Sequence, residues 1–320
     1  MQATLSHVLG LLLCVTLSSQ ASQLRPWAEW KAEYSKVYDS QEADVNAFAA
    51  WLRNTEYVTA HNNQPHHTFK LKVNKFGDKI FNITPGVHTL SNVLRFMPRL
   101  PHPIVTPKPP ASWDWRTKGV ISPVQNQGQM GSAEAIVIAA DLDSALAITS
   151  GSLKNLSAQE VVDCCSVTPG LLDSNVYKCI FKLGGLCTAA DYPQRSSGSC
   201  HSPKYFYYNG VRAQKNETAM VLAVLKTPLV VYVDASLASF QMYHSGVYSD
   251  PSCGATIDHT MQLVGYGTSQ GQPYWILKNS WGVDWGMSGY MLMVRGRNMC
   301  GVATMAKYPS GASPPEIHPH

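Results

Sequence analysis

Apolar residues in the first part of the chain recur with the period of a helix. Between residues 24 and 62, aromatic and aliphatic side chains stand at helical spacings among polar residues, which predicts helix. Lys70–Phe76 alternates polar and apolar residues instead, as a short strand does. Further along, Ser132 is suited to cap a helix, the apolar run 133–148 follows it, and Gly151 stops it. We therefore expect a long helix that begins at residue 133.

The last third of the chain has the pattern of a sheet. Four runs are rich in β-branched and aromatic residues and are bounded by glycine, proline or asparagine, namely Leu229–Val233, Met261–Tyr266, Tyr274–Leu277 and Tyr290–Val294. Helices early in the chain and strands late in it predict an α+β protein with two packed halves, and not alternating βα units.

Segments without these patterns divide the chain. The apolar stretch 8–17 is too short to cross a bilayer and leads to small residues of the kind that a signal peptidase reads. Residues 99–110 hold five prolines, which is typical of an extended linker that proteases can reach. The predicted organisation is a signal peptide (1–21), a helical domain (24–85), a proline-rich linker (86–110), a large domain (111–310) and a flexible tail (311–320).

The cysteines agree with export. Removal of the signal peptide leaves seven of the eight cysteines, so at least one of them stays outside the intrachain disulfides. Sequons for N-glycosylation begin at Asn82, Asn155 and Asn216. We therefore expect a secreted, extracellular or lysosomal protein.

Composition restricts the partners. The 320 residues carry a formal net charge of +4, only 14% of them are charged, and no dense run of lysine or arginine occurs. Nucleic acids and anionic membranes are therefore not expected partners. Because no cysteine pair or histidine has the spacing of zinc ligands, we expect no metal site and no cofactor.

Four blocks of motifs follow one another between residues 113 and 290. They read WDWRTKGVISPVQNQG at 113–128, LSAQEVVDC at 156–164, DHTMQLVGYG at 258–267 and YWILKNSWGVDWGMSGY at 274–290. In content and order they resemble the mature domain of papain-like cysteine proteases, in particular the cathepsin L group. The resemblance implies a papain-like two-lobed α+β fold, with a helical left lobe and a β-barrel-like right lobe.

The segment before the linker resembles, more loosely, the inhibitory pro-region of the same family. The matching residues are Trp51, Asn54, Val58 and Asn62 in a helical motif and Asn74, Phe76 and Asp78 in a second motif. Ala43, Ala47 and Lys72 depart from these motifs. The resemblance thus implies that a helical, inhibitor-like pro-domain precedes the papain-like domain.

The resemblance also assigns roles to single residues. It implies that His259 is the general base, that Asn279 orients it, and that Gln127 is the side-chain donor to an oxyanion. Trp281 would shield the hydrogen bond between the histidine and the asparagine from water, which strengthens that bond.

The nucleophile of this set is missing. Where the family has Cys-Gly-Ser-Cys-Trp, the chain has Met-Gly-Ser-Ala-Glu at 130–134, so Ala133 presents a methyl group in place of a thiol. Met130 replaces a second cysteine, and the disulfide partner of that cysteine aligns with Val167. Because Glu134 and this lost disulfide accompany Ala133, natural loss of catalysis explains the sequence better than an engineered replacement of the catalytic cysteine by alanine does.

Glu134 and the neighbouring nucleophiles each leave an alternative open. A carboxylate close to His259 would keep the imidazole protonated and raise its pKa, whereas a glutamate in a first helical turn can simply face solvent. Ser132 and Cys165 are candidate replacement nucleophiles. The hydroxyl of Ser132 is better suited to cap the helix, and Cys165 belongs to a different motif from the histidine.

The remaining assignments concern the cleft and the disulfides. The resemblance implies a substrate cleft lined by Gly170, Trp281, Met305, Ile257 and Thr260, although Met305 fits a core position equally well. It also pairs Cys164 with Cys200, and Cys253 with Cys300. Proximity along the chain suggests a disulfide between Cys179 and Cys187, which would leave Cys165 as the odd thiol.

Two classes of function follow. The first is a monomeric, non-proteolytic pseudoprotease that binds a peptide, another protein or its own pro-segment in the remnant cleft. The second is a cysteine-type endopeptidase with a non-standard nucleophile or with its cysteine mutated. Labelling by an epoxide-type covalent inhibitor distinguishes the two classes.

Overall fold

The structure is a computed structural model that describes residues 25–81, 108–128, 132–165, 175–194 and 210–310. The predicted signal peptide, most of the predicted linker and the predicted tail lie outside these ranges. The chain forms two compact units, of which the first comprises residues up to 64 and 72–80, and the second comprises residues 65–71 and those from 81 onward.

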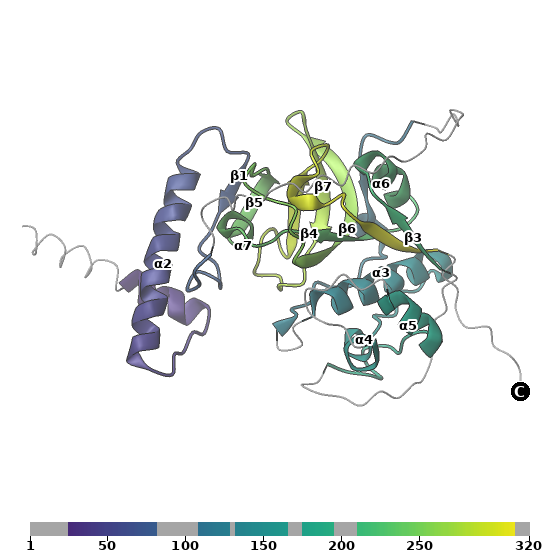
Figure 1. The fold of residues 1–320 in the computed structure, drawn as a ribbon, viewed down its shortest axis with the longest axis horizontal. Coiled ribbons are helices and arrows are strands. Elements are labelled where there is room, and N and C mark those ends of the chain that lie inside the picture. The colour runs from purple at the N-terminus through teal and green to yellow at the C-terminus, as the bar shows by residue number, and fades with distance from the viewer. Residues whose placement is uncertain (1–24, 82–107, 129–131, 166–174, 195–209, 311–320) are drawn as a thin grey trace, which may run out of the picture. The chain divides into compact units, whose positions relative to one another are not determined.

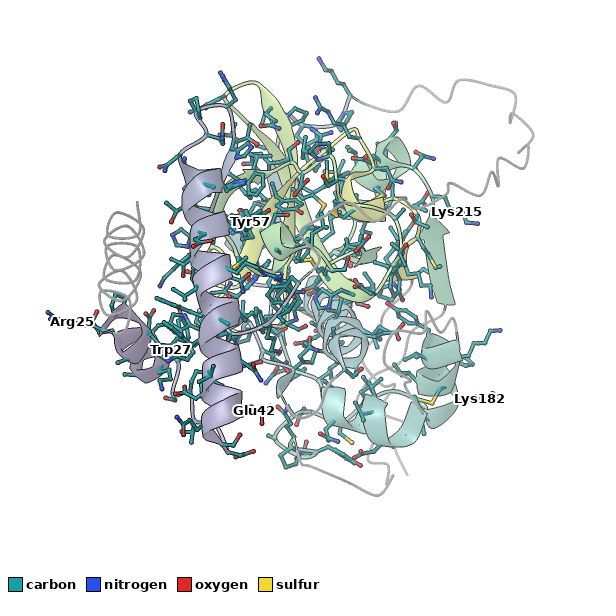
Figure 2. The ribbon with its side chains drawn as sticks, turned by 60° about the vertical axis from the view of Figure 1, so that its left-hand side comes forward. Arg25, Trp27, Glu42, Tyr57, Lys182 and Lys215 are labelled. Atoms are coloured by element: carbon teal, nitrogen blue, oxygen red, sulfur yellow. A yellow bond between two sulfur atoms is a disulfide. The ribbon has the colours of Figure 1, made fainter. Side chains whose placement is uncertain are left out.

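In the described part of the first unit, two helices pack around a cluster of aromatic rings. Residues 25–33 form a short helix, and α2 (Gln41–Asn62) begins after Ser40, whose Oγ accepts a hydrogen bond from the Ala43 amide. A turn with a left-handed residue at Ser35 interrupts the helix that was predicted over 24–62. The ring of Trp27, which is labelled in Figure 2, packs on that of Trp51 in α2. Their centroids are 5.6 Å apart. This aromatic core holds the two helices together.

A buried asparagine fixes the turn that follows in the first unit. Asn54 of α2 is fully buried, and its Nδ2 donates to the carbonyl oxygens of Gly77 and Lys79 at 2.8 Å each. The Asp78 carboxylate in the same turn accepts hydrogen bonds from Lys36 Nζ and the Tyr38 hydroxyl. Both residues belong to the motifs that resemble the pro-region, and these contacts give the two residues a structural role.

The strand predicted over Lys70–Phe76 is shorter than the pattern suggests. The observed strand is β1 (Phe69–Leu71), which belongs to the second unit and pairs with β5 (Tyr243–Tyr248). Asn74 Oδ1 accepts a hydrogen bond from the Phe76 amide, so the chain turns where the alternating pattern continues. A side chain that bonds its own backbone competes with the ladder of a sheet.

The long helix of the second unit is α3 (Ala133–Ser150), and it is almost entirely buried. Ser132 Oγ accepts from the Ala135 amide at the start, and Gly151 ends the helix with a φ of +73°. Residues 133–147 are all buried. Shorter helices, α4 (Ala158–Cys165) and α5 (Asn175–Leu183), lie beside α3 (Figure 1) and share its hydrophobic core. The predicted start and stop of this helix are confirmed.

The other face of α3 packs on a sheet. Its strands beyond β1 and β5 are β2 (Trp113–Asp114), β3 (Gly210–Gln214), β4 (Leu229–Val233), β6 (His259–Ser269), β7 (Gln272–Lys278), β8 (Tyr290–Val294) and β9 (Ala306–Ser310). Their order is β1-β5-β8-β7-β6-β4-β9-β3, with β2 on β6. Only the β5–β8 pair is parallel among the described pairs. Two further helices, α6 (Glu217–Val224) and α7 (Ala238–Gln241), complete an α+β unit, which confirms the predicted class.

The disulfides differ in part from the predicted pairs. Cys253 is joined to Cys300, the pair that the resemblance implied. Cys164 is disulfide-bonded, and its predicted partner Cys200 lies outside the described residues. Cys165 is joined to Cys179, so both the Cys179–Cys187 pair and the odd thiol at Cys165 were wrong.

The physical reason is the direction in which these cysteines face. Cys165 at the end of α4 faces Cys179 in α5, with 5.6 Å between their Cα atoms, which suits a disulfide. Cys187 is instead a buried thiol beside Glu160, and burial raises its pKa to about 12. Closeness along the chain therefore misidentified the partner of Cys179.

Candidate functional site

A histidine and an asparagine lie close together where two neighbouring strands of the sheet begin and end. His259 is the first residue of β6, and Asn279 follows the last residue of β7. Because these strands pair antiparallel, the start of one and the end of the other lie at the same edge. His259 Nε2 and Asn279 Oδ1 are hydrogen-bonded at 2.7 Å. The same oxygen accepts the Ser280 amide, so the asparagine is fixed in the orientation that holds the ring.

A tryptophan covers this pair. The rings of Trp281 and His259 lie 4.6 Å apart between centroids. Trp281 is itself held by edge-on contacts with Phe240 and Trp285, and the Trp285 indole nitrogen donates to the Gln241 carbonyl. An aromatic cluster thus lies against the histidine that bonds Asn279.

Burial sets the charge of the histidine. Removal of the imidazole from water lowers the pKa of His259 to about 4, and the hydrogen bond with Asn279 opposes this shift only in part. The ring is therefore neutral above about pH 4, so it can accept a proton. The hypothesis that Glu134 raises the pKa of His259 is wrong, because burial of the ring dominates.

Gln127 is oriented by the residue next to the asparagine. Its Oε1 accepts a hydrogen bond from the Ser280 hydroxyl at 2.9 Å, and its backbone N–H donates to the Ser280 carbonyl at 2.8 Å. Because the amide oxygen is occupied, the Nε2 group remains as the donor that an oxyanion requires. Ser280 was not singled out from the sequence, although it stands inside the motif at 274–290.

The position of the nucleophile holds no reactive group. Ala133 is the first residue of α3, and its methyl group is buried. The adjacent Ser132 hydroxyl caps the helix through the Ala135 amide, as predicted. Cys165 lies in a disulfide with Cys179 and has no thiolate to offer. Among the described residues, the predicted replacements for the missing cysteine are therefore already engaged in structural bonds.

Glu134 does not face solvent, which was one of the two alternatives for it. Its side chain is buried, and Oε1 accepts a hydrogen bond from the Tyr232 hydroxyl at 3.1 Å. Tyr232 lies in β4 directly opposite Thr260, the neighbour of the histidine in β6. Lys307 of β9 is buried with its ammonium 5.3 Å from the centre of the Tyr232 ring. The sequence could not reveal this cluster, since its three members are far apart along the chain.

Replacement of Tyr232 by phenylalanine tests this contact. The variant leaves the buried Glu134 carboxylate without its hydroxyl donor, so we expect the free energy of unfolding to fall by about 1–3 kcal/mol. Urea unfolding of the variant and the wild type measures the loss. Tyr266→Phe is the control, because its hydroxyl donates to the neutral carbonyl of Pro110. Equal losses in both variants would show that no charge strengthens the bond to Glu134.

The predicted cleft residues are found in different surroundings. Ile257 and Met305 are half-buried and pack against the hydrophobic core around α3, whereas Thr260 is buried in the sheet. Gly170 lies outside the described residues. Of the predicted sequons, Asn155 and Asn216 are exposed, and Asn82 lies outside the described residues.

Two structural properties bear on membranes and metals. Within the described ranges, no helix combines the length and hydrophobicity that a membrane span requires. In the same part of the chain, no three side chains of the metal-binding types gather as a metal site would need.

Comparisons with known proteins identify the family of each part of the chain. Residues 109–310 match the family described as papain family cysteine protease, and residues 27–81 match the cathepsin propeptide inhibitor domain (I29). Procathepsin L of Felis catus is 34% identical and covers 93% of this chain and 97% of its own length. Pro-cathepsin H of Bos taurus is 36% identical, with 94% of this chain and 95% of its own length covered.

Solved structures give the same result for the fold. The recombinant stem bromelain precursor matches with a TM-score of 0.75 at 30% identity, over 91% of this chain and 99% of that one. Digestive procathepsin L 3 of Tenebrio molitor matches with a TM-score of 0.73 at 28% identity, over 90% of this chain and 98% of that one. The chain therefore has the papain-like fold and belongs to the papain family of cysteine proteases, as a cathepsin L-like member with its own propeptide inhibitor domain.

Proposed function

We propose that the chain is a non-proteolytic member of this family, which acts by binding a peptide or a protein. The observation that carries the proposal is Ala133 at the first position of α3. Covalent catalysis by this fold needs a thiolate there, at the positive end of the helix dipole. Loss of such a nucleophile removes about six orders of magnitude of turnover in a comparable protease and leaves only weak assistance from the oxyanion donor.

The rest of the site supports a role in binding. His259, Asn279, Gln127 and Ser280 form a connected set of hydrogen bonds that is rigid and partly buried. Hydrogen bonds in such a low-dielectric site are strengthened, and the bond from Ser280 holds the Gln127 side chain in a fixed orientation. A peptide carbonyl placed near the Gln127 amide would be bound, but it would not be attacked.

The pro-segment is the first ligand to consider. The inhibitor domain retains its aromatic core and the hydrogen bonds of Asn54 and Asp78. We infer that this domain binds the remnant cleft of the papain-like domain, and that other peptides bind there once the linker is cleaved. The disulfides are consistent with passage through the secretory pathway, so we place the protein outside the cell or in the lysosome.

A peptidase with a non-standard nucleophile is the second candidate. The neutral His259 and the oriented Gln127 favour it, because a base and an oxyanion donor are still in place. Cys187 does not supply its nucleophile, since burial and the neighbouring Glu160 raise the pKa of its thiol to about 12. A thiol with that pKa is almost wholly protonated at neutral pH.

Treatment with an epoxide-type covalent inhibitor separates the candidates. We expect no added mass on the protein after its pro-segment is removed, and no cleavage of a fluorogenic peptide. Saturable binding of extended peptides, measured by fluorescence polarisation, is expected for the same sample. An adduct at a single residue would establish the peptidase instead, and a lack of peptide binding before and after removal of the pro-segment would refute the binding role.

A further inference from the structure

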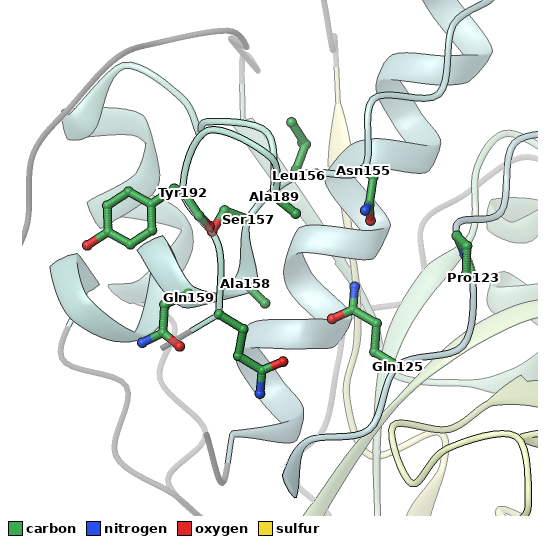
Figure 3. Close-up of a pocket in the computed structure, with 10 residues that line it drawn as sticks. Pro123, Gln125, Asn155, Leu156, Ser157, Ala158, Gln159, Ala189 and Tyr192 are labelled. Atoms are coloured by element: carbon green, nitrogen blue, oxygen red, sulfur yellow. The ribbon is translucent and has the colours of Figure 1, made fainter. Parts of the chain in front are cut away.

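A small pocket in the second unit is lined by none of the residues of the histidine site. It has a volume of about 160 Å³ and is lined by Pro123, Gln125, residues 155–159, Ala189, Tyr192 and Gln194 (Figure 3). None of these side chains is charged, and four of them carry amide groups. Pockets for drug-sized ligands are larger, roughly 300–1,000 Å³. The pocket therefore suits one small, neutral group that both donates and accepts hydrogen bonds.

The rim of this pocket is held rigidly at Asn155. The Asn155 amide donates to both carboxylate oxygens of the buried Asp143, and its carbonyl accepts from the Ala189 amide at 2.7 Å. The residue has a φ of +56°, which asparagine tolerates better than most residues. Its side chain is exposed, and in Figure 3 it and Gln125 point toward a common space. The backbone thus fixes where a group attached to Asn155 would lie.

Asn155 also begins a sequon, Asn155-Leu156-Ser157. We propose that Asn155 carries an N-linked glycan and that its first N-acetylglucosamine occupies this pocket. In the modification, Asn155 Nδ2 loses one proton and bonds to C1 of the sugar, while the bond from C1 to the diphosphate of a polyprenyl-diphosphate-linked oligosaccharide breaks and the polyprenyl diphosphate leaves with that proton. The acetamido group is neutral and has one donor and one acceptor, which matches the amide side chains of the lining.

The surroundings of Ser157 determine when the sugar is added. Its hydroxyl is buried, donates to the Tyr192 carbonyl at 2.7 Å and accepts the Glu160 amide. The hydroxyl of a sequon must be accessible to the enzyme that reads it. Modification therefore precedes folding of this segment, and the sugar enters the pocket as α4 forms.

The second described sequon lacks these features. Asn216 is exposed, its Oδ1 caps α6 through the Ala219 amide, and it does not line the pocket. A glycan at Asn216 would extend into solvent, since the cap uses the oxygen and leaves the nitrogen for the sugar. Asn216 is therefore the internal reference for an unprotected glycan.

Enzymatic deglycosylation of the full chain secreted by eukaryotic cells tests the proposal. Peptide-N-glycosidase in ¹⁸O-water converts each glycosylated asparagine to a labelled aspartate, which peptide mass spectrometry locates. We expect label at Asn155, released roughly tenfold or more slowly from native than from denatured protein, because the attached sugar is enclosed until the segment opens. Gln125→Ala should speed the native release, and the control Asn216→Gln should leave it unchanged.

Two outcomes would overturn the inference. Unlabelled Asn155 after complete denaturation would show that the residue carries no glycan. Label at Asn155 with the same rate of release from native and denatured protein would show that the sugar lies outside the pocket. Variants that fail to fold do not affect either result, since both are read from the wild type.

Discussion

Replacing Ala133 by cysteine and Glu134 by tryptophan should convert the protein, once its pro-segment is removed, into a peptidase. We expect hydrolysis of a fluorogenic peptide to rise by about 10³-fold or more over the wild type, because the restored step is the one whose loss costs most in such enzymes. The new thiol would stand at the start of α3, where the helix dipole lowers its pKa. His259 is neutral and already oriented by Asn279, so it can take the thiol proton.

The two single variants show how much each substitution contributes to the restored activity. Ala133→Cys alone should be labelled by the epoxide inhibitor but should turn over peptide more slowly, because the neighbouring Glu134 carboxylate disfavours a thiolate. Glu134→Trp alone should remain inactive. Ala133→Cys combined with Glu134→Trp and His259→Ala is the matched control, which keeps the thiol and lacks the base. Absence of labelling in the variant that has both cysteine and histidine would show that residue 133 does not face the base.

The sequence predicts the elements that carry strong local signals. The long helix starts after a serine cap and stops at a glycine, and the observed α3 has both boundaries. The runs at Leu229–Val233 and Tyr290–Val294 coincide with β4 and β8. The helix α7 was missed because its four residues span barely one turn, and β9 was missed because its sequence AKYPS contains a proline and lacks a β-rich run. Tertiary contacts, rather than local preference, decide whether such segments form.

For the site, too, the sequence predicts some features and not others. His259, Asn279 and Gln127 stand inside recognisable motifs, and the structure joins them through Asn279 and Ser280. The bond between Glu134 and Tyr232 joins residues 98 positions apart, and no local pattern encodes it. Burial of the histidine is likewise a property of the folded state, because Trp281 and the sheet around it exclude water. The hypothesis that Glu134 keeps the ring charged therefore failed, because no local pattern reveals this burial.

Acidification should destabilise the protein through His259. The folded-state pKa of about 4 lies below the ordinary value of 6.5, so the unfolded state gains a proton first as the pH falls. This histidine contributes full stability above pH 6.5, and the contribution is lost between pH 6.5 and 4. The shift corresponds to about 3 kcal/mol. Urea unfolding at a series of pH values measures the loss, and an NMR titration of the ring should have its midpoint near 4.

Other buried groups change stability in the opposite direction, so the effect must be isolated. Burial raises the pKa values of Asp141, Asp143 and Asp258, and their contributions are present at low pH and lost as the pH rises. These contributions are the same in the wild type and in His259→Gln. They therefore cancel when the free energy of unfolding of the variant is subtracted from that of the wild type at each pH.

The difference in the free energy of unfolding between the wild type and His259→Gln should decrease by about 3 kcal/mol from pH 7 to pH 4. Trp281→Ala should admit water to the ring, raise its pKa toward the ordinary value and flatten the profile. A wild-type midpoint near 6.5 would mean that the ring is hydrated, and the tryptophan cover would then have no electrostatic effect. A midpoint near 4 in the wild type and a higher midpoint in Trp281→Ala would show that exclusion of water sets the protonation state of His259. A neighbouring charge would then not be its cause.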